Sequence, residues 1–331
     1  MKEQVFTSRE RYRGRDTALR GASGMSGTAL LGVVLLVLFL IGCAEGTGTS
    51  GQAALEPMNR TAPEDILVSP AWVAERAGEV VVLDYARSMD DFRQGHVPGA
   101  AWLARAVTVT NVEGVDGMLP DPATVAMDLE EAGVRHDTPV VVYDSGNGLW
   151  ASRLFWALEY LGHEQVHLLD GGITAWTASG RELSTEIAVP ERGEFDPRVR
   201  ENLVADEAFV FENHGNSDFT VLDARSPDEF SGADVRAARG GHIPDSVNID
   251  WVRNLGDAGT FLSVAELSEL YQQTLEGRDG PRVTLCQTGI RGAHTYVALR
   301  VLGEEDVRLY DGSWAQWGNN PDAPIAVGST P

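Results

Sequence analysis

The residues best suited to chemistry lie in one short loop. This loop contains, in order, Cys286, Gln287, Thr288, Gly289, Ile290 and Arg291. The apolar run 283–285 before it predicts a buried strand, and residues 292–302 after it predict a helix that ends at Gly303. Backbone N–H groups at the start of a helix lack partners, and the helix dipole is positive there. This setting favours the nucleophilic thiolate of Cys286, so the loop is predicted to hold a sulfur anion.

Cys286 also has a simpler interpretation as a small buried hydrophobe, because free cysteines are among the most buried residues. The strand–loop–helix context favours the nucleophile instead. Arg291 stands five positions after Cys286, with four residues between them. At that spacing it would place a fixed positive charge near the sulfur.

The elements that must position this loop belong to an internal repeat, which occurs twice in the sequence. The matching stretches are 80–88 with 219–226, 95–100 with 241–246, and 169–172 with 310–313. In each copy short apolar strands alternate with helices, which predicts an α/β fold with a mainly parallel sheet flanked by helices. Ligands of such sheets bind at the carboxyl ends of the strands, where Cys286 lies.

The repeat predicts two tandem domains. The N-terminal domain would span residues 65–183, and the C-terminal catalytic domain would span residues 203–327. Between them, residues 184–202 have mixed polarity and contain prolines and a glycine, which is typical of a linker.

Features found in only one copy are the candidates for chemistry, and Cys286 is one of them. Counting back from the loop glycines places Ser145 opposite Cys286, and a slip of one residue places Asp144 there. Trp150 stands opposite Arg291. The first copy therefore has neither the nucleophile nor the cation, and we predict that it is inactive and structural.

Features found in both copies are expected to serve the fold. His96 and His242 recur in matching Gly-His-x-Pro turns, so we interpret both as turn and core residues. Asp84 and Asp223 recur at the ends of matched strands, where carboxylates accept hydrogen bonds from loop backbone.

The N-terminal segment has the pattern of an export signal. Basic residues precede the apolar run 29–41, which is short for a membrane span. The run ends in Leu-Ile-Gly-Cys at Cys43, which resembles the lipobox of bacterial lipoproteins. Residues 1–43 are therefore predicted to be a signal peptide with Cys43 lipidated, and residues 44–64 a flexible tether. The alternative is an uncleaved signal anchor.

This signal predicts an exported protein of the bacterial cell envelope, on the periplasmic side and with the outer membrane as one candidate location. The formal net charge of −23 argues against nucleic-acid partners and against charge-driven docking on anionic lipid. Contact with the membrane would then depend on the lipid anchor alone. Cys43 and Cys286 are the two cysteines of the sequence, which leaves no disulfide framework. No motif for a metal or a cofactor is evident.

Four motifs together resemble the tandem-domain rhodaneses of the thiosulfate/3-mercaptopyruvate sulfurtransferase family. They are Asp223-x-Arg225, Gly241-His242-Ile243-Pro244, the Cys-x-x-Gly-x-Arg loop at 286–291, and Tyr310-Asp311-Gly312-Ser313-Trp314. The resemblance implies a sulfurtransferase in which Cys286 takes a sulfane sulfur from thiosulfate or a similar small anionic donor. The resulting persulfide would pass its outer sulfur to cyanide or to a thiol. The family also implies an inactive first domain.

The resemblance assigns roles to further residues. Substrate binding would fall to the loop residues Gln287, Thr288, Gly289, Ile290 and Arg291. Arg236 and Arg239 are candidate substrate cations, because the usual substrate arginine after Asp-x-Arg is replaced by Asp228-Glu229-Phe230. Asp223, Arg225 and His242 would structure the loops. No cofactor is implied, and we expect a monomer.

Other functions remain open at this level. The loop matches neither the thiosulfate nor the mercaptopyruvate pattern, so 3-mercaptopyruvate is an alternative donor. Cysteine phosphatases and arsenate reductases use a Cys-x5-Arg loop, which has one residue more than the loop from Cys286 to Arg291. A non-catalytic envelope module that binds a partner or senses redox state through Cys286 is the third alternative.

Overall fold

The structure is a computed structural model that describes residues 60–216, 219–278 and 280–328. The predicted signal peptide with Cys43, and residues 44–59 of the predicted tether, lie outside these ranges. Residues 60–64 belong to the folded body, because the hydroxyl of Thr61 bonds both the N–H and the C=O of Val166 at 2.8 and 2.9 Å. In the described ranges, no helix has the length and the apolar character needed to cross a bilayer.

The first copy of the repeat forms a five-stranded parallel sheet in the order β1-β7-β6-β2-β3. Its strands are β1 (Leu67–Val68), β2 (Val81–Tyr85), β3 (Ala101–Leu103), β6 (Val140–Tyr143) and β7 (Val166–Leu169). Its helices are α1 (Pro63–Ile66), α2 (Pro70–Glu75), α3 (Met89–Gln94), η2 (Arg105–Val107), α4 (Pro122–Glu131), α5 (Leu149–Tyr160) and α6 (Gly172–Ala178). An antiparallel hairpin of β4 (Thr110–Val112) and β5 (Val115–Met118) extends from this copy.

The second copy forms a matching parallel sheet in the order β10-β9-β11-β12-β8. Its strands are β8 (Val204–Ala205), β9 (Thr220–Asp223), β10 (Val247–Asn248), β11 (Arg282–Leu285) and β12 (Val307–Tyr310). Its helices are η3 (Glu201–Leu203), α7 (Glu207–Asn213), α8 (Pro227–Ser231), η4 (Trp251–Asn254), α9 (Val264–Leu275), α10 (Ile290–Val301) and α11 (Ser313–Trp317). Two mainly parallel sheets flanked by helices confirm the predicted fold class.

Two helices begin at local capping signals. Asp121 caps α4 and accepts a hydrogen bond from the N–H of Ala123, with a proline as the first helical residue. Ser263 and Glu266 form a reciprocal capping box at the start of α9.

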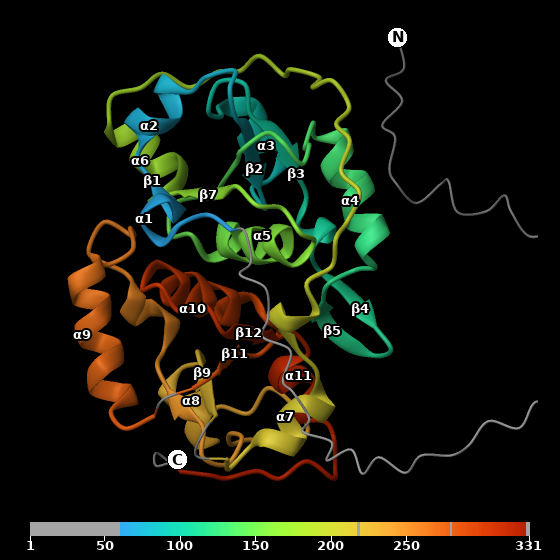
Figure 1. Cartoon of the computed structure of the whole chain (residues 1–331), viewed down its shortest axis with the longest axis vertical. Helices are drawn as coiled ribbons and strands as arrows, with labels where there is room; N and C mark the ends of the chain where they lie inside the picture. Colours follow the sequence, from blue (N-terminus) through green and yellow to red (C-terminus); the bar gives the residue numbers. More distant parts are fainter. Residues whose placement is uncertain (1–59, 217–218, 279, 329–331) are drawn as a thin grey trace, which may run out of the picture. The chain divides into compact units, whose positions relative to one another are not determined.

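The two copies meet through α5 and α10, which lie side by side (Figure 1). Both helices are buried nearly all round, as expected for helices inside a core. Leu154 and Leu158 of α5 and Val297 of α10 belong to one apolar cluster that spans both copies. The second copy therefore positions α10 partly by packing against the first.

His294 of α10 is buried in this contact and stacks on Phe261 with ring centroids 4.3 Å apart. Burial lowers the pKa of His294 to about 3. In the unfolded chain its pKa is about 6.5, so between pH 6.5 and pH 3 the unfolded state binds a proton that the folded state does not. Stability is therefore complete above pH 6.5 and is lost as the pH falls through this window.

The expected consequence is a pH-dependent difference between the wild type and His294→Gln. Between pH 7 and pH 5 the wild type should lose about 2 kcal/mol more of its free energy of unfolding than the variant, which has no group to titrate there. Urea unfolding at the two pH values measures this difference. Equal losses in the two proteins would show that His294 is not the buried neutral group.

Candidate active site

Cys286 follows β11 directly, at the carboxyl end of the central strand of the second sheet, and its side chain is buried. The loop turns into α10 at Gly289, whose φ is +80°. A Cβ at Gly289 would lie 2.9 Å from both Arg153 Nη1 and Asp311 Oδ1. Only glycine suits this position, because it combines left-handed backbone with a close approach by a buried ion pair.

The backbone of Cys286 rests on residues 311–314, which we call the platform. The N–H of Cys286 donates to Ser313 Oγ at 3.2 Å, and its C=O accepts from the N–H of Trp314 at 3.0 Å. The Ser313 hydroxyl donates in turn to the C=O of Tyr310 at 2.8 Å. Ser313 has a φ of 49°, which is unusual for a residue with a Cβ. The platform thus fixes both backbone polar groups of Cys286.

The strand register identifies the residue of the first copy that matches Cys286. Leu285 pairs with Asp223 across β11 and β9, and Tyr143 pairs with Asp84 across β6 and β2. The residue after Tyr143 is Asp144. Its C=O accepts a hydrogen bond from the N–H of Ile173, as that of Cys286 does from Trp314.

Asp144, and not Ser145, therefore stands opposite Cys286. Counting back from the glycines misplaced the match because the first loop is one residue longer. Ser145 is exposed to solvent.

The carboxylate of Asp144 shows what this type of loop holds. Four backbone N–H groups donate to its two oxygens at 2.9 to 3.2 Å, namely those of Gly146, Gly148, Trp150 and Ala151. We call this ring of donors the anion cradle. In the second copy the N–H groups of Gly289, Arg291 and Gly292 occupy the positions that match those of Gly148, Trp150 and Ala151. A loop of this geometry stabilises an anion directly after the strand.

Arg291 is held by an ion pair that sequence analysis did not anticipate. Its two Nη atoms donate to the two oxygens of Glu229 at 2.6 and 2.8 Å, and the Glu229 side chain is only 2% exposed. Burial raises the pKa of Glu229, but the hydrogen bonds and charge of Arg291 outweigh it and lower that pKa to about 2. Burial lowers the pKa of Arg291, but the hydrogen bonds and charge of Glu229 and the electrostatic interaction with Cys286 raise it, and the net shift is upward.

These contacts hold Arg291 in one position near Cys286. They also occupy both Nη atoms, so fewer N–H donors are available to a substrate than we predicted. One feature of the sequence could have drawn attention to Glu229. It is the third residue after Ser226 and completes a capping box at the start of α8. That box holds Glu229 on the helix that faces the catalytic loop.

The two candidate substrate cations differ. Arg239 donates to the backbone carbonyls of Trp317, Asn320 and Ala323. These bonds are typical of a structural role, and the role of Arg239 in substrate binding stays a prediction. Arg236 is half exposed, lies 3.6 Å from Glu229, and accepts a hydrogen bond on its C=O from the Gln287 side chain at 3.1 Å. Arg236 is the candidate that the structure places beside the loop.

The remaining loop residues border the first copy and solvent. Thr288 is half-buried and touches Gly117 of β5, where a Cβ would lie 2.5 Å from the Thr288 Cβ. Ile290 is the first residue of α10 and is also half-buried.

Asp223, Arg225 and His242 make contacts typical of a structural role. Arg225 Nε and Nη2 donate to the carboxylate of Asp223 at 2.6 to 3.0 Å, and Nη2 also donates to the C=O of Gly241. His242 is fully buried, and its Nδ1 bonds the C=O of Phe230 at 2.9 Å. His96 makes the matching bond to Phe92 in the first copy.

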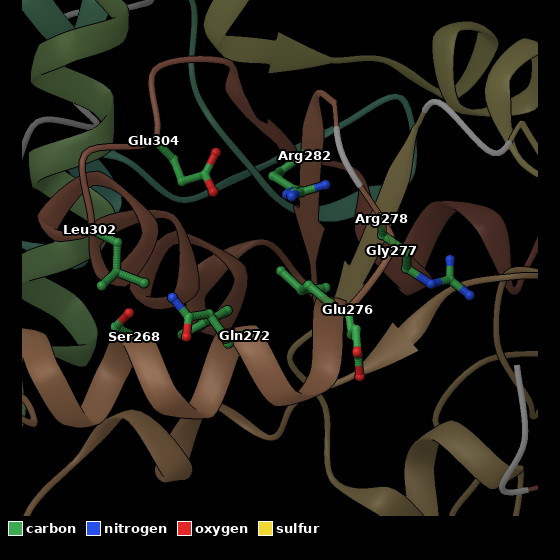
Figure 2. Close-up of a pocket in the computed structure, with 10 residues that line it drawn as sticks. Ser268, Gln272, Glu276, Gly277, Arg278, Arg282, Leu302 and Glu304 are labelled. Atoms are coloured by element: carbon green, nitrogen blue, oxygen red, sulfur yellow. The ribbon is translucent and has the colours of Figure 1, made fainter.

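A cavity of about 530 Å³ lies elsewhere, at the amino end of β11 (Figure 2). Its lining includes Arg282, Gln272 and Glu304. Arg282 is the first residue of the strand and Cys286 follows the last, so this cavity is separate from the cysteine loop.

Comparison with known proteins agrees with this geometry. A model of the Rhodanese-like domain matches residues 69–179 and 210–320. The chain belongs to the rhodanese family. It carries two rhodanese domains in tandem, and the prediction of a tandem rhodanese is confirmed.

Its relatives include enzymes of the predicted class. A thiosulfate sulfurtransferase of Pseudomonas aeruginosa is 33% identical over 264 residues, which is 79% of this chain and 97% of that protein. A probable 3-mercaptopyruvate sulfurtransferase of the same organism is 34% identical and covers 79% of this chain and 98% of its own length. The crystal structure of SseA from Escherichia coli, a 3-mercaptopyruvate enzyme, has a TM-score of 0.68 at 28% identity, over 75% of this chain and 98% of that one. The predicted sulfurtransferase activity is confirmed at the level of the enzyme class.

The match between Asp144 and Cys286 leads to a prediction for the first rhodanese domain. In Asp144→Ala four N–H groups lose their acceptor, so the free energy of unfolding should fall by about 2 to 4 kcal/mol. Sulfur transfer per folded molecule should stay within about twofold of wild type, because this loop carries no nucleophile. Denaturant melts and an assay at a temperature where both proteins are folded measure the two effects. Ser145→Ala is the matched control and should change neither. A large loss of transfer in folded Asp144→Ala would contradict the structural role of this loop.

Proposed function

We propose that the protein moves the sulfane sulfur of thiosulfate, or of a similar small anion, to cyanide or a thiol through a persulfide on Cys286. The observation that carries this proposal is the anion cradle. In the first domain it holds a carboxylate, and in the second domain the matching position belongs to the cysteine sulfur. A persulfide anion has the same charge and suits the same donors.

The reaction needs two displacements at sulfur. The Cys286 thiolate attacks the outer sulfur of thiosulfate, the S–S bond breaks, and sulfite leaves with the bonding electron pair. The acceptor then attacks the outer sulfur of the persulfide. The Cys286 thiolate is released, and cyanide becomes thiocyanate or a thiolate becomes a persulfide. Neither step requires a histidine, because a thiolate is itself a nucleophile and the donors of the cradle suit each sulfur anion.

The charges around the loop favour a donor with a compact anionic group. The Arg291 side chain is 18% exposed in its ion pair with Glu229, and Arg236, which also pairs with Asp234 at 3.0 Å, is half exposed at the same edge. Together they can attract one anionic head while the sulfane sulfur reaches Cys286. We propose that the protein acts in this way as a monomer.

Steady-state assays with thiosulfate and cyanide test this proposal. We expect turnover with thiosulfate that exceeds turnover with 3-mercaptopyruvate. The opposite order would make the protein a mercaptopyruvate enzyme like its SseA neighbour. No turnover with either donor, combined with oxidation of Cys286 by peroxide, would favour the redox-sensing alternative.

We also propose that the protein is exported and anchored to the cell envelope by a lipid on Cys43. The supporting feature is the sequence Leu-Ile-Gly-Cys after an apolar run of about 13 residues. Metabolic labelling with a fatty acid in a bacterial host should label the wild type and leave Cys43→Ser unlabelled. Absence of label in both proteins would favour an uncleaved signal anchor.

A further inference from the structure

We propose that Arg153, which belongs to the first, inactive domain, is a positioning residue for the catalytic loop of the second. This inference rests on the proposed persulfide chemistry of Cys286. It gives the first domain a part in the reaction beyond a structural role. Arg153 would act through Asp311 and the platform and would not touch the substrate.

Arg153 is a fully buried cation, and each of its three guanidinium nitrogens donates at least one hydrogen bond. Its Nη1 donates to Asp311 Oδ1 at 2.5 Å. Its Nε and Nη2 donate to the C=O of Thr108 at 3.3 and 3.1 Å, and Nη2 also donates to the C=O of Gly117 at 3.0 Å. A buried guanidinium held at three points has little freedom to move. It therefore fixes Asp311 relative to the first domain.

Asp311 carries that constraint to the cysteine. Its second oxygen accepts the N–H of Leu119 at 2.7 Å, so the first domain holds both carboxylate oxygens. Asp311 begins the platform, and two residues later Ser313 accepts the N–H of Cys286. The next residue, Trp314, donates to the C=O of Cys286. An unbroken series of hydrogen bonds and peptide bonds thus joins Arg153 to the backbone of the nucleophile.

The internal repeat provides a comparison for this arrangement. The first residues of α5 and α10 follow Gly148 and Gly289, and five residues after each glycine stand Arg153 and His294. Each side chain reaches the loop of the opposite domain. A Cβ at Gly289 would lie 2.9 Å from Arg153 Nη1, and a Cβ at Gly148 would lie 3.8 Å from His294 Nε2.

The carboxylates that follow the last strand of each domain are matched as well. Asp170 accepts the N–H of Phe261 from the second domain at 2.9 Å, as Asp311 accepts that of Leu119 from the first. What differs is the charge. The loop with Cys286 receives a permanent cation, whereas the loop with Asp144 faces a histidine that is neutral at pH 7. The cation is thus placed on the side where a sulfur anion must be held.

The β4–β5 hairpin adds a second contact to the same loop. It lies beside α11 (Figure 1). Gly117, whose C=O binds Arg153, packs so closely on Thr288 that a Cβ would lie 2.7 Å from the Thr288 carbonyl oxygen. Arg153 therefore fixes the hairpin and the platform on two sides of the catalytic loop.

The test compares three variants of the full chain for the rate of persulfide formation with thiosulfate, read at the Cys286 peptide by mass spectrometry. Arg153→Met and Asp311→Asn should each slow the reaction by about tenfold to a hundredfold, because a small displacement of the nucleophile is costly. Asp170→Asn is the matched control. It should destabilise the fold to a similar degree and leave the rate within about twofold. If Arg153→Met does not fold, the comparison of Asp311→Asn with Asp170→Asn still decides.

Two further readouts separate positioning from general damage. The double variant Arg153→Met/Asp311→Asn should be no slower than the slower single variant, since both residues act through one connection. Alkylation of Cys286 by iodoacetamide needs no sulfur donor and should slow in the same order. If the wild type forms no persulfide but the wild type and the variants are alkylated in this order, the proposed function is contradicted and the positioning role stands. Equal rates in Asp311→Asn, Asp170→Asn and wild type would overturn the positioning role.

Discussion

Cys286→Ser is expected to abolish sulfur transfer, with a loss of more than about a thousandfold in turnover. A hydroxyl is not ionised near neutral pH and cannot carry a sulfane sulfur, so both displacements lose their nucleophile. The anion cradle and Arg291 remain in place in this variant, and the buried serine is smaller than the thiol. We therefore expect a folded protein that binds an anionic donor without consuming it.

The thiosulfate–cyanide assay measures this loss, and Asp144→Ala provides the matched control at the equivalent position of the first domain. The variant of Cys286 should be inactive and the variant of Asp144 active. Substantial residual turnover in Cys286→Ser would remove the cysteine from the mechanism.

Arg291→Met is expected to have the second largest effect, and the effect has two parts. Glu229 would be left as a buried carboxylate whose remaining cation is the half-exposed Arg236, 3.6 Å away, so the free energy of unfolding should fall by about 3 to 5 kcal/mol. Persulfide formation should slow by about a hundredfold, because the loop loses the positive charge beside the sulfur anion.

The double variant Glu229→Gln/Arg291→Met separates these parts. Removing the buried carboxylate should recover most of the stability, whereas the slow persulfide formation should persist. Glu229→Gln alone keeps the cation and frees it from its partner, so its KM for thiosulfate should not rise. A double variant that regains both stability and rate would show that Arg291 serves the fold only.

The sequence was sufficient for the fold and for the enzyme class. Local patterns carry both, because strands and helices alternate with clear periodicity and the loop 286–291 is contiguous. The repeat also predicted correctly that the first copy lacks the cysteine. It could not fix which residue takes the place of Cys286, since a loop longer by one residue shifts any count from the glycines. Strand pairing at Asp84 and Asp223 decided the match with Asp144.

The contacts that hold the loop 286–291 could not be predicted from the sequence, for a different reason. Glu229 lies 62 residues from Arg291, and Arg153 lies 158 residues from Asp311. Each pair is created by tertiary packing, and the spacing of residues along a chain carries no signal for it. Ser313 lay in a motif that we recognised, but its role depends on the backbone turn that aims its hydroxyl at Cys286.

The most direct test of the persulfide on Cys286 is the intact mass of the protein before and after thiosulfate, and again after cyanide. The full chain with Cys43→Ser is suitable, because Cys286 is then its single thiol. We predict a gain of one sulfur atom, about 32 Da, that cyanide removes and that Cys286→Ser does not show. No gain with thiosulfate, with 3-mercaptopyruvate or with a low-molecular-weight persulfide would contradict Cys286 as the sulfur carrier.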